Sequence, residues 1–391
     1  MAVPSLKAQF DALLKAPSIS CTQPEFDQSN MQVINLLADW LGELGFACDI
    51  QPIAGEPGKA NLIATLGSGP GGLVLAGHTD TVPCNPEKWN FDPFALTEAN
   101  GRWYGLGSCD MKGFFPLIIE AARAYADRPF HQPLIVLATA DEESSMSGAR
   151  ALAASGQPKA RHAVIGEPTG LRPVRVHKGI LMERIDIIGQ AGHSSDPSLG
   201  RSALEAMHLV IAGLIDLRGQ WQKRWNDPLF SVPTPTLNLG CIHGGDNPNR
   251  ICAKCALEFD IRPLPGMDPD ALRADIQSRL HRVAAERQVR IDYKPLFPGV
   301  PPLNTPANAP LVLACEQLTG HSAGSVAFAT EGPYFNQAGM QTLILGPGDI
   351  DQAHQPDEYL AMDRIQPTVD LLKQLIERFC LSADADPAPT H

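Results

Sequence analysis

The sequence predicts an α/β protein: a mixed, largely parallel β-sheet with helices on both faces, and a ferredoxin-like α+β domain inserted into it. Two observations support this fold class. Over residues 1–175, and again after residue 299, short apolar runs that end in an acid or a histidine alternate with helical patterns. Between them, residues 176–298 follow the order strand, helix, strand, strand, helix, strand. We therefore expect a first domain made of residues 1–175 and 299–382, the inserted domain, and a disordered tail over residues 383–391.

The first part of the chain supplies most of the large sheet. Residues 29–46 predict a helix that Gly45 ends, because one apolar stripe runs along them: Val33, Ile34, Leu37, Leu41 and Leu44. Residues 133–140 form a short, continuous apolar run with β-branched members, which is typical of a strand buried on both faces of a parallel sheet. The other predicted elements are strands at 61–65, 72–76 and 163–166 and helices at 114–125 and 147–154.

The inserted domain has its own pattern. Its first helix starts near Ser202, where Glu205 completes a capping box, and its second starts at Asp268, followed by Pro269. Its strands are predicted at 181–189, 236–241, 250–261 and 289–293. After a proline-rich linker, the chain returns to the first domain with a helix at 310–318, a strand at 341–345 and a helix at 363–379.

Composition limits the possible partners. The 391 residues carry a net charge of −12, which disfavours nucleic acid and anionic membranes because no basic patch could neutralise phosphates. The first 20 residues do not resemble a signal peptide, and no apolar run approaches the roughly 18 residues that a transmembrane helix needs. Nine scattered cysteines indicate reduced thiols rather than a disulfide framework. We expect a soluble cytoplasmic protein.

Polar residues gather where the predicted strands and loops of the first domain end. The set comprises His78, Asp80, Asp110, Glu142, Glu143, Glu167 and His354. In open α/β sheets, ligands bind at the carboxyl ends of strands. The three consecutive acids from Asp141 to Glu143 would repel one another unless a cation neutralised them or some stayed protonated. Two histidines with several carboxylates are a ligand set for zinc or a similar divalent ion.

Each of these residues alone has an ordinary explanation. Asp110 could cap the following helix, Glu167 could be a solvated loop acid, and His354 could be a surface histidine. Taken together, such explanations would require a surplus of carboxylates to meet at one sheet edge by coincidence. A non-catalytic metal-binding or amino-acid-binding protein remains an alternative of a different class, although the complete ligand set and Glu142 argue against it.

Spacing suggests how the roles divide. His78 and Asp80 are two apart in extended chain, so they share a face, which suits a ligand histidine oriented by a carboxylate. Glu142 and Glu143 are adjacent and cannot both point the same way, so one can bind metal while the other holds a water molecule. Two divalent cations would balance Asp110, Glu143, Glu167 and one hydroxide, which leaves Glu142 as the proton carrier.

Other chemistries are less well supported. Gly67, Gly69 and Gly72 fit a dinucleotide-binding fingerprint, but a strand follows them instead of a helix, so a turn is favoured. No nucleophile elbow or Walker loop is present. Cys252 and Cys255 form a single C-x-x-C pair, and positions three apart in a strand face opposite sides, so a structural role is favoured.

Several motifs together resemble one family, the metallopeptidases that include acetylornithine deacetylases, succinyl-diaminopimelate desuccinylases, aminoacylases and glutamate carboxypeptidases. The motifs are Gly77-His-Thr-Asp-Thr-Val-Pro83, Gly107-Ser-Cys-Asp-Met-Lys-Gly113, Ala140-Asp-Glu-Glu143, Gly166-Glu-Pro168, Gly192-His-Ser-Ser195 and Asp260-Ile-Arg-Pro263. Within the family, Pro235–Gly240, Asn249–Cys252, Asp260–Gly266, Leu345–Gly348 and Ala353–Glu358 are most similar to the acetylornithine deacetylase branch.

The resemblance implies two Zn²⁺ ions per subunit, for which Co²⁺ can substitute. One ion would be held by His78, Asp110 and Glu167 and the other by Asp110, Glu143 and His354. Asp80 would orient His78, and Glu142 would be the general base.

It also implies a homodimer formed through the inserted domain, in which His193 reaches the partner's site. Substrate contacts would come from Arg262, Asn249 and Thr330. The implied reaction is deacetylation of N2-acetyl-L-ornithine in arginine biosynthesis, with acetylcitrulline deacetylase, desuccinylase and dipeptidase as alternatives.

Overall fold

The computed structural model describes residues 3–382, so the tail predicted over residues 383–391 lies outside the described residues. The described chain forms two compact units. The first contains the chain up to Arg175, Thr305–Gly324 and the chain from Thr330 onward. The second contains Val176–Asn304 and Ser325–Ala329. Within the described residues, we find no helix with the length and apolar character to cross a membrane.

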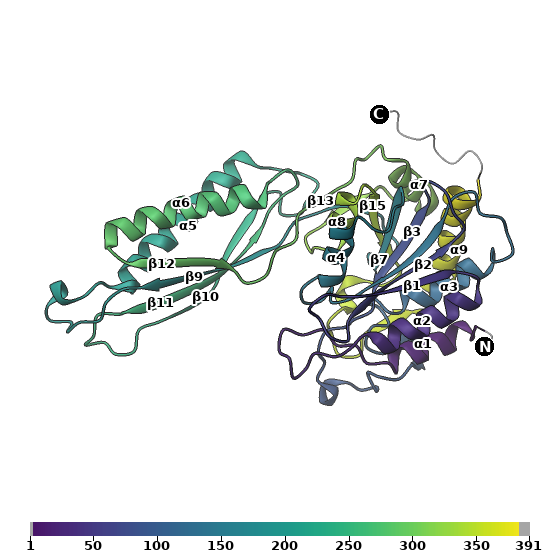
Figure 1. Ribbon diagram of the computed structural model, residues 1–391, viewed down its shortest axis with the longest axis horizontal. Helices are drawn as coiled ribbons and strands as arrows, with labels where there is room; N and C mark the ends of the chain where they lie inside the picture. Colours follow the sequence, from purple (N-terminus) through teal and green to yellow (C-terminus); the bar gives the residue numbers. More distant parts are fainter. Residues whose placement is uncertain (1–2, 383–391) are drawn as a thin grey trace. The chain divides into compact units, whose positions relative to one another are not determined.

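A mixed sheet forms the centre of the first unit, as predicted (Figure 1). Its middle strands are mutually parallel and fully or almost fully buried: β6 (Leu134–Thr139), β3 (Leu73–His78), β7 (His162–Pro168) and β15 (Gln341–Gly346). Antiparallel strands flank them: β2 (Ala60–Leu66) and β1 (Ala47–Pro52) beyond β6, and β8 (Val174–His177) beyond β15. The β6 run is therefore parallel to β3 but antiparallel to β2.

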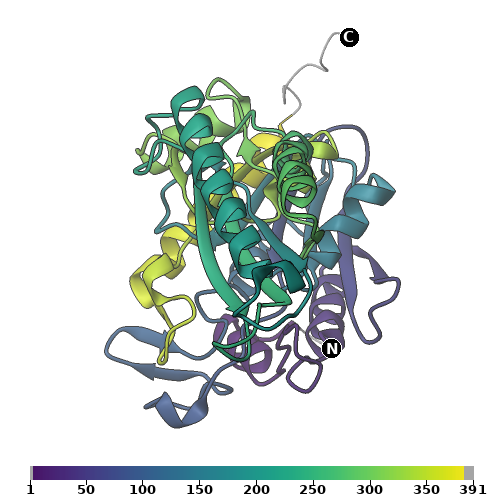
Figure 2. The same ribbon diagram turned by 90° about the vertical axis from the view of Figure 1, so that its left-hand side faces the viewer.

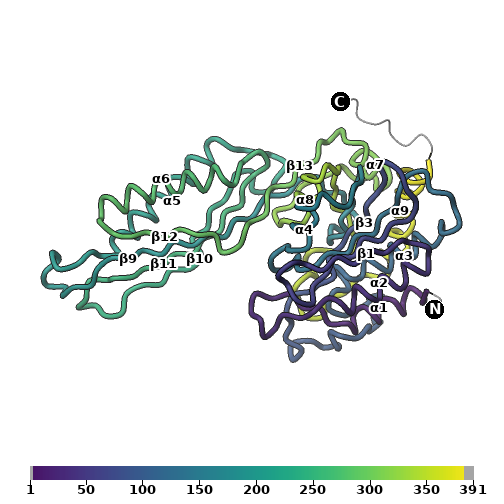
Figure 3. The backbone as a smooth tube through the Cα atoms, viewed as in Figure 1, coloured from purple at the N-terminus to yellow at the C-terminus, as the bar shows by residue number. Residues whose placement is uncertain are grey.

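Helices cover both faces of this sheet, and their path is traced in Figure 3. One shared apolar core takes in α1 (Leu6–Leu14), α2 (Met31–Glu43), α3 (Phe114–Arg123), α7 (Pro310–Thr319) and α9 (Ile365–Ile376). Helix α3 is almost entirely apolar, since it lies between the sheet and its neighbours α1 and α9. Helices α4 (Ser147–Ser155) and α8 (Gly332–Gln337) pack together outside that core.

The second unit has the predicted ferredoxin-like order. Its antiparallel sheet runs β10-β11-β9-β12, formed by β10 (Thr236–Gly244), β11 (Lys254–Arg262), β9 (Leu181–Ile188) and β12 (Arg290–Pro295). Figure 2 shows α5 (Ala203–Arg224) and α6 (Pro269–Arg287) side by side over this sheet. Alternate residues of β9 and β11 are buried, because only the helix-covered face is apolar. Ser202 caps α5 by accepting a hydrogen bond from the Glu205 N–H, and Asp268 caps α6.

Some elements differ from the prediction. Strand β11 begins at Lys254 instead of residue 250, because Arg250 closes a turn onto Asn247 and bridges to His193. Cys252 therefore precedes the strand, so the argument that it and Cys255 face opposite sides of one strand is wrong; both are nevertheless buried, and all nine cysteines are free thiols. The strand β1 was not predicted, since its residues are largely exposed and form no apolar run. Three short strands that pair with one another were also missed: β4 (Thr97–Ala99), β5 (Arg102–Tyr104) and β16 (Tyr359–Ala361).

Candidate metal centre

The structure brings seven of the predicted site residues to one edge of the first unit's sheet. The strands β3, β6 and β7 are parallel neighbours, so their carboxyl ends meet. His78 ends β3, Glu142 and Glu143 follow β6, and Glu167 lies near the end of β7. Loops supply the other three, which are Asp80 after β3, Asp110 before α3, and His354 after β15.

Asp110 lies between the two histidines. One of its carboxylate oxygens is 3.1 Å from His78 Nε2, and the other is 3.4 Å from His354 Nε2. Each histidine also faces a glutamate. His78 Nε2 is 3.7 Å from Glu167 Oε1, and His354 Nε2 is 3.0 Å from Glu143 Oε1. The donors therefore form two groups that share Asp110.

These donors fit divalent cations. With zinc–ligand distances of about 2.0–2.2 Å, neighbouring ligands of a tetrahedral ion lie roughly 3.3–3.6 Å apart, close to the donor separations observed here. The nitrogen and oxygen donors are those that zinc prefers. Glu167 Oε1 is buried and has no hydrogen-bond partner among the described residues, as expected of an oxygen that binds a cation. Two sets of donors have all their atoms within 4.8 Å of one another: His78 with Asp110 and Glu143, and His78 with Glu142 and Glu167.

The pKa values of the cluster also indicate a site for divalent cations. Burial, and then the charge of a neighbouring carboxylate, raises the pKa of Glu142 and of Glu167 well above the ordinary glutamate value. Hydrogen bonds that His354 donates to the carboxylates of Asp110 and Glu143 raise its pKa to about 10. Burial would raise the pKa of Asp110, but hydrogen bonds from His354 and His78 outweigh it and lower that pKa. Without a cation, the cluster therefore retains protons that a divalent ion would displace.

Asp80 fixes the backbone of Glu142 and Glu143 by hydrogen bonds. The Asp80 carboxylate accepts the Glu142 N–H at 3.2 Å and the Glu143 N–H at 3.0 Å. His78 Nδ1 lies 3.0 Å from the Asp80 carbonyl oxygen and 3.7 Å from its carboxylate. Asp80 thus contacts His78 chiefly through its carbonyl, while its carboxylate fixes the turn that carries both glutamates.

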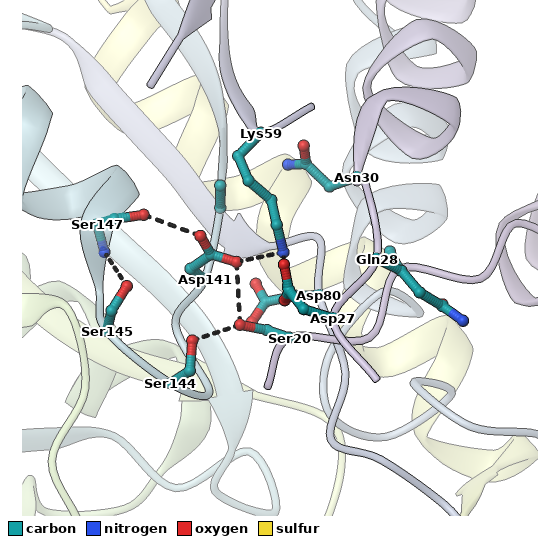
Figure 4. A network of polar contacts seen from close by, with 12 residues as sticks. Ser20, Asp27, Gln28, Asn30, Lys59, Asp80, Asp141, Ser144, Ser145 and Ser147 are labelled. Carbon is teal, nitrogen blue, oxygen red and sulfur yellow. Dashed lines mark hydrogen bonds and ion pairs between the residues drawn. The ribbon is translucent and has the colours of Figure 1, made fainter. Parts of the chain in front are cut away.

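The third acid of the run, Asp141, points away from the cluster. Its carboxylate contacts the buried Lys59 ammonium at 2.7 Å, together with hydroxyls of Ser20 and Ser147 (Figure 4). The expected repulsion among the three acids is therefore relieved in part by a lysine of this chain. Lys59 was not singled out from the sequence, because nothing near it in the chain marks it as a partner of residue 141.

Two further buried acids were missed. Glu358 accepts backbone N–H groups of Gly107, Cys109 and Asp110, and burial, followed by the Asp110 charge, raises its pKa to about 8. Burial raises the pKa of Glu331 to about 7, and its carboxylate accepts a hydrogen bond from Thr139. A signal for Glu358 was available, since it follows His354 by four residues in the same motif.

The proposed substrate contacts are not all in one place. Thr330 belongs to the first unit; it is buried and accepts the Gly332 N–H at 3.1 Å. His193, Asn249 and Arg262 belong to the second unit. There, the exposed His193 and Asn249 neighbour each other beyond the start of β11, whereas Arg262 ends that strand and contacts Asp260 at 2.9 Å.

Comparison with known proteins identifies the family. The model of peptidase family M20/M25/M40 matches residues 74–378. The acetylornithine deacetylase of Edwardsiella ictaluri is 50% identical over 378 residues, which cover 97% of this chain and 98% of that protein. The acetylornithine deacetylase of Proteus mirabilis is 49% identical over 383 residues, with 98% and 99% covered.

Solved structures show the same fold at lower identity. The aminopeptidase PepT of Bacillus cereus superimposes with a TM-score of 0.76 at 20% identity, over 95% of this chain and 97% of that one. A tripeptidase of Staphylococcus aureus gives a TM-score of 0.73 at 20% identity, with the same coverage. From its sequence and its fold, the chain belongs to peptidase family M20/M25/M40.

Proposed function

We propose that this protein is a metal-dependent amidohydrolase that removes the acetyl group from N2-acetyl-L-ornithine, giving acetate and L-ornithine in arginine biosynthesis. The observation that carries the proposal is the cluster around Asp110: two histidines and the surrounding glutamates meet in a chain that is half identical, almost end to end, to acetylornithine deacetylases. An enzyme that supplies ornithine for biosynthesis is expected in the cytoplasm, where its nine thiols stay reduced.

The donor geometry supports two cations. We assign His78, Asp110 and Glu167 to one ion and Asp110, Glu143 and His354 to the other, with Zn²⁺ as the expected metal and Co²⁺ as a substitute. When bound, such ions polarise an acyl carbonyl and make a water molecule more acidic. The shared carboxylate of Asp110 supports this assignment, because each of its oxygens faces a different histidine.

Glu142 is then the base. Its carboxylate takes a proton from the attacking water and later returns it to the nitrogen of the leaving amine, so that one group serves both steps. Glu142 has a raised pKa, which suits a group that must hold a proton between those steps. Asp80 accepts the Glu142 N–H at 3.2 Å and so helps to fix the backbone that carries this base.

Substrate recognition would involve the second unit. Arg262 is assigned to the α-carboxylate, since its guanidinium can bind a carboxylate with two parallel hydrogen bonds. Thr330 and Asn249 are assigned to the substrate on the resemblance alone.

We assign His193 to the oxyanion of the partner subunit's site. Lys254 and Arg262 are the two ends of β11, roughly 26 Å apart at 3.3 Å per residue, and His193 bridges to Arg250, just before Lys254. A small substrate cannot span that distance, so Arg262 and His193 of one chain would serve two different sites.

A homodimer is supported by the surface of the second unit. The edge strand β10 is exposed over most of its length, and its Ile242 is 50% exposed. Leu204 and Ile215 on α5 are also exposed. An exposed edge strand presents unpaired N–H and C=O groups that can pair with another chain, and in a symmetric dimer the same patch of both chains meets.

A substrate panel tests the function. The metal-loaded protein is assayed with N2-acetyl-L-ornithine, N-acetyl-L-citrulline, N-succinyl-diaminopimelate and a dipeptide, at equal concentration. The proposal predicts the highest kcat/KM for N2-acetyl-L-ornithine. A higher value for any of the other three would replace the substrate assignment while keeping the hydrolase class, and turnover of none would contradict the function itself.

A further inference from the structure

The backbone turn at Asp141 determines the orientation of the Glu142 and Glu143 side chains. Asp141 has a φ of 58°, a left-handed conformation that non-glycine residues seldom adopt, and its carbonyl accepts the N–H groups of Ser145 and Met146. That turn determines where the next two side chains point. Because such a conformation is unfavourable for aspartate by itself, the surrounding contacts must hold it.

The contacts that hold it converge on the Asp141 carboxylate (Figure 4). One oxygen accepts from Lys59 Nζ at 2.7 Å and from Ser20 Oγ at 2.9 Å, and the other accepts from Ser147 Oγ at 3.0 Å. Lys59 is 4% exposed, and its ammonium also donates to Asp27 at 2.9 Å. Three donors from three different segments therefore fix one carboxylate from both sides.

The lysine is charged. Burial would lower the pKa of Lys59, but hydrogen bonds to Asp141 and Asp27 outweigh it, and the net effect is a raised pKa. The ion pair places a buried positive charge at the residue directly before Glu142. It also relieves the repulsion that Asp141 would otherwise add to the acids of the centre.

We propose that the Lys59–Asp141 ion pair is a positioning device that fixes the turn after β6 and thereby directs Glu142 and Glu143 to their separate places in the centre. This inference rests on the proposed function for the role of Glu142, whereas the position of Glu143 opposite His354 is independent of it. Asp80 accepts the N–H groups of the same two residues. The turn is therefore fixed at its backbone by Asp80 and at the Asp141 side chain by Lys59.

The test compares Lys59→Met with Lys59→Arg. In Lys59→Met the ammonium is lost, so Asp141 should leave its position. We expect the affinity for Co²⁺, titrated by absorption spectroscopy, to fall about 10- to 100-fold, and kcat at saturating Co²⁺ to fall by a similar factor with little change in KM. Lys59→Arg keeps the charge and should recover most of both losses.

Two further variants separate positioning from general destabilisation. Arg273→Met breaks a partly buried ion pair with the fully buried Glu183 in the second unit, and should lower the melting temperature without changing Co²⁺ affinity. Ser20→Ala removes one neutral donor to Asp141 and should give a smaller loss of Co²⁺ affinity in the same direction, a measurement that remains available if Lys59→Met does not fold.

The inference is overturned if Lys59→Met, or Ser20→Ala where Lys59→Met does not fold, binds Co²⁺ as the unaltered protein does. It is also overturned if Arg273→Met loses Co²⁺ affinity and kcat to the same extent as Lys59→Met. If the unaltered protein hydrolyses no N-acyl amino acid, the proposed function fails, yet the Co²⁺ titrations still decide whether Lys59 positions Glu143.

Discussion

At the end of β6, two neighbouring glutamates have different surroundings. Glu143 contacts His354 at 3.0 Å, whereas Glu142 lies in a set of potential metal ligands with His78 and Glu167. Both have raised pKa values, so composition and charge do not distinguish them. The orientation of their side chains does distinguish them, because the backbone turn directs the two glutamates to different partners.

Substitution of each glutamate should therefore have a different result. Glu143→Ala removes a ligand and should reduce metal content. Glu142→Ala should retain the metals and lose the proton transfer, lowering kcat by about 10²–10⁴-fold with KM little changed. Metal stoichiometry and kcat are measured for both variants, each serving as the control for the other. Loss of metal in Glu142→Ala with retention in Glu143→Ala would show that the roles are reversed.

Arg262 provides a second test at this scale. Its guanidinium contacts Asp260 at 2.9 Å, and in the proposed function it pairs with the α-carboxylate of the substrate. Arg262→Leu should weaken kcat/KM for N2-acetyl-L-ornithine far more than for the corresponding α-amide, since only the former carries the charge that the arginine pairs. An equal loss on both substrates is incompatible with this role.

At the scale of elements, one buried acid ties two loops of the centre together. Glu358 follows the loop of His354 and accepts three N–H groups from the loop of Asp110, and its own carbonyl accepts the Gly105 N–H. The strand pairing of β16 with β5 continues the same connection. The two loops are therefore joined by several contacts, which help to keep Asp110 between the histidines.

Truncation of this acid should be costly. Glu358→Ala leaves three buried N–H groups without an acceptor, at about 1–3 kcal/mol each, so the free energy of unfolding should fall by roughly 3 kcal/mol or more. Glu358→Gln keeps an oxygen that can accept the same donors and should lose much less. Urea unfolding of both variants measures this, and equal stability of the two would refute the explanation.

One sequence pattern predicts both the central sheet and the metal centre. Short apolar runs locate the parallel strands, and polar residues at their ends must meet at one edge, which places His78, Glu143 and Glu167 without further information. Contacts between distant segments leave no such pattern. Lys59 and Asp141 are 82 positions apart, and Glu358 binds backbone groups, which have no sequence signature. Strand β1 was not predicted because it is largely exposed and has no apolar run.

In the whole molecule, the proposed roles of His193 and Arg262, which lie toward opposite ends of β11, require that two subunits share each site. Inactive His193→Ala and inactive Glu142→Ala protein should regain activity when mixed, because a mixed dimer contains one site with both an intact base and an intact histidine. Native mass spectrometry checks that mixed dimers form. If they form and remain inactive, His193 does not act on the partner subunit's site.

The central claim is that the residues around Asp110 hold two divalent cations without which no hydrolysis occurs. The direct measurement is a reconstitution titration: the chelator-treated protein, shown to be metal-free by elemental analysis, receives Zn²⁺ or Co²⁺ stepwise while hydrolysis of N2-acetyl-L-ornithine is followed. We predict no turnover at the start and full activity at two ions per chain. Full turnover by the metal-free protein would contradict the claim.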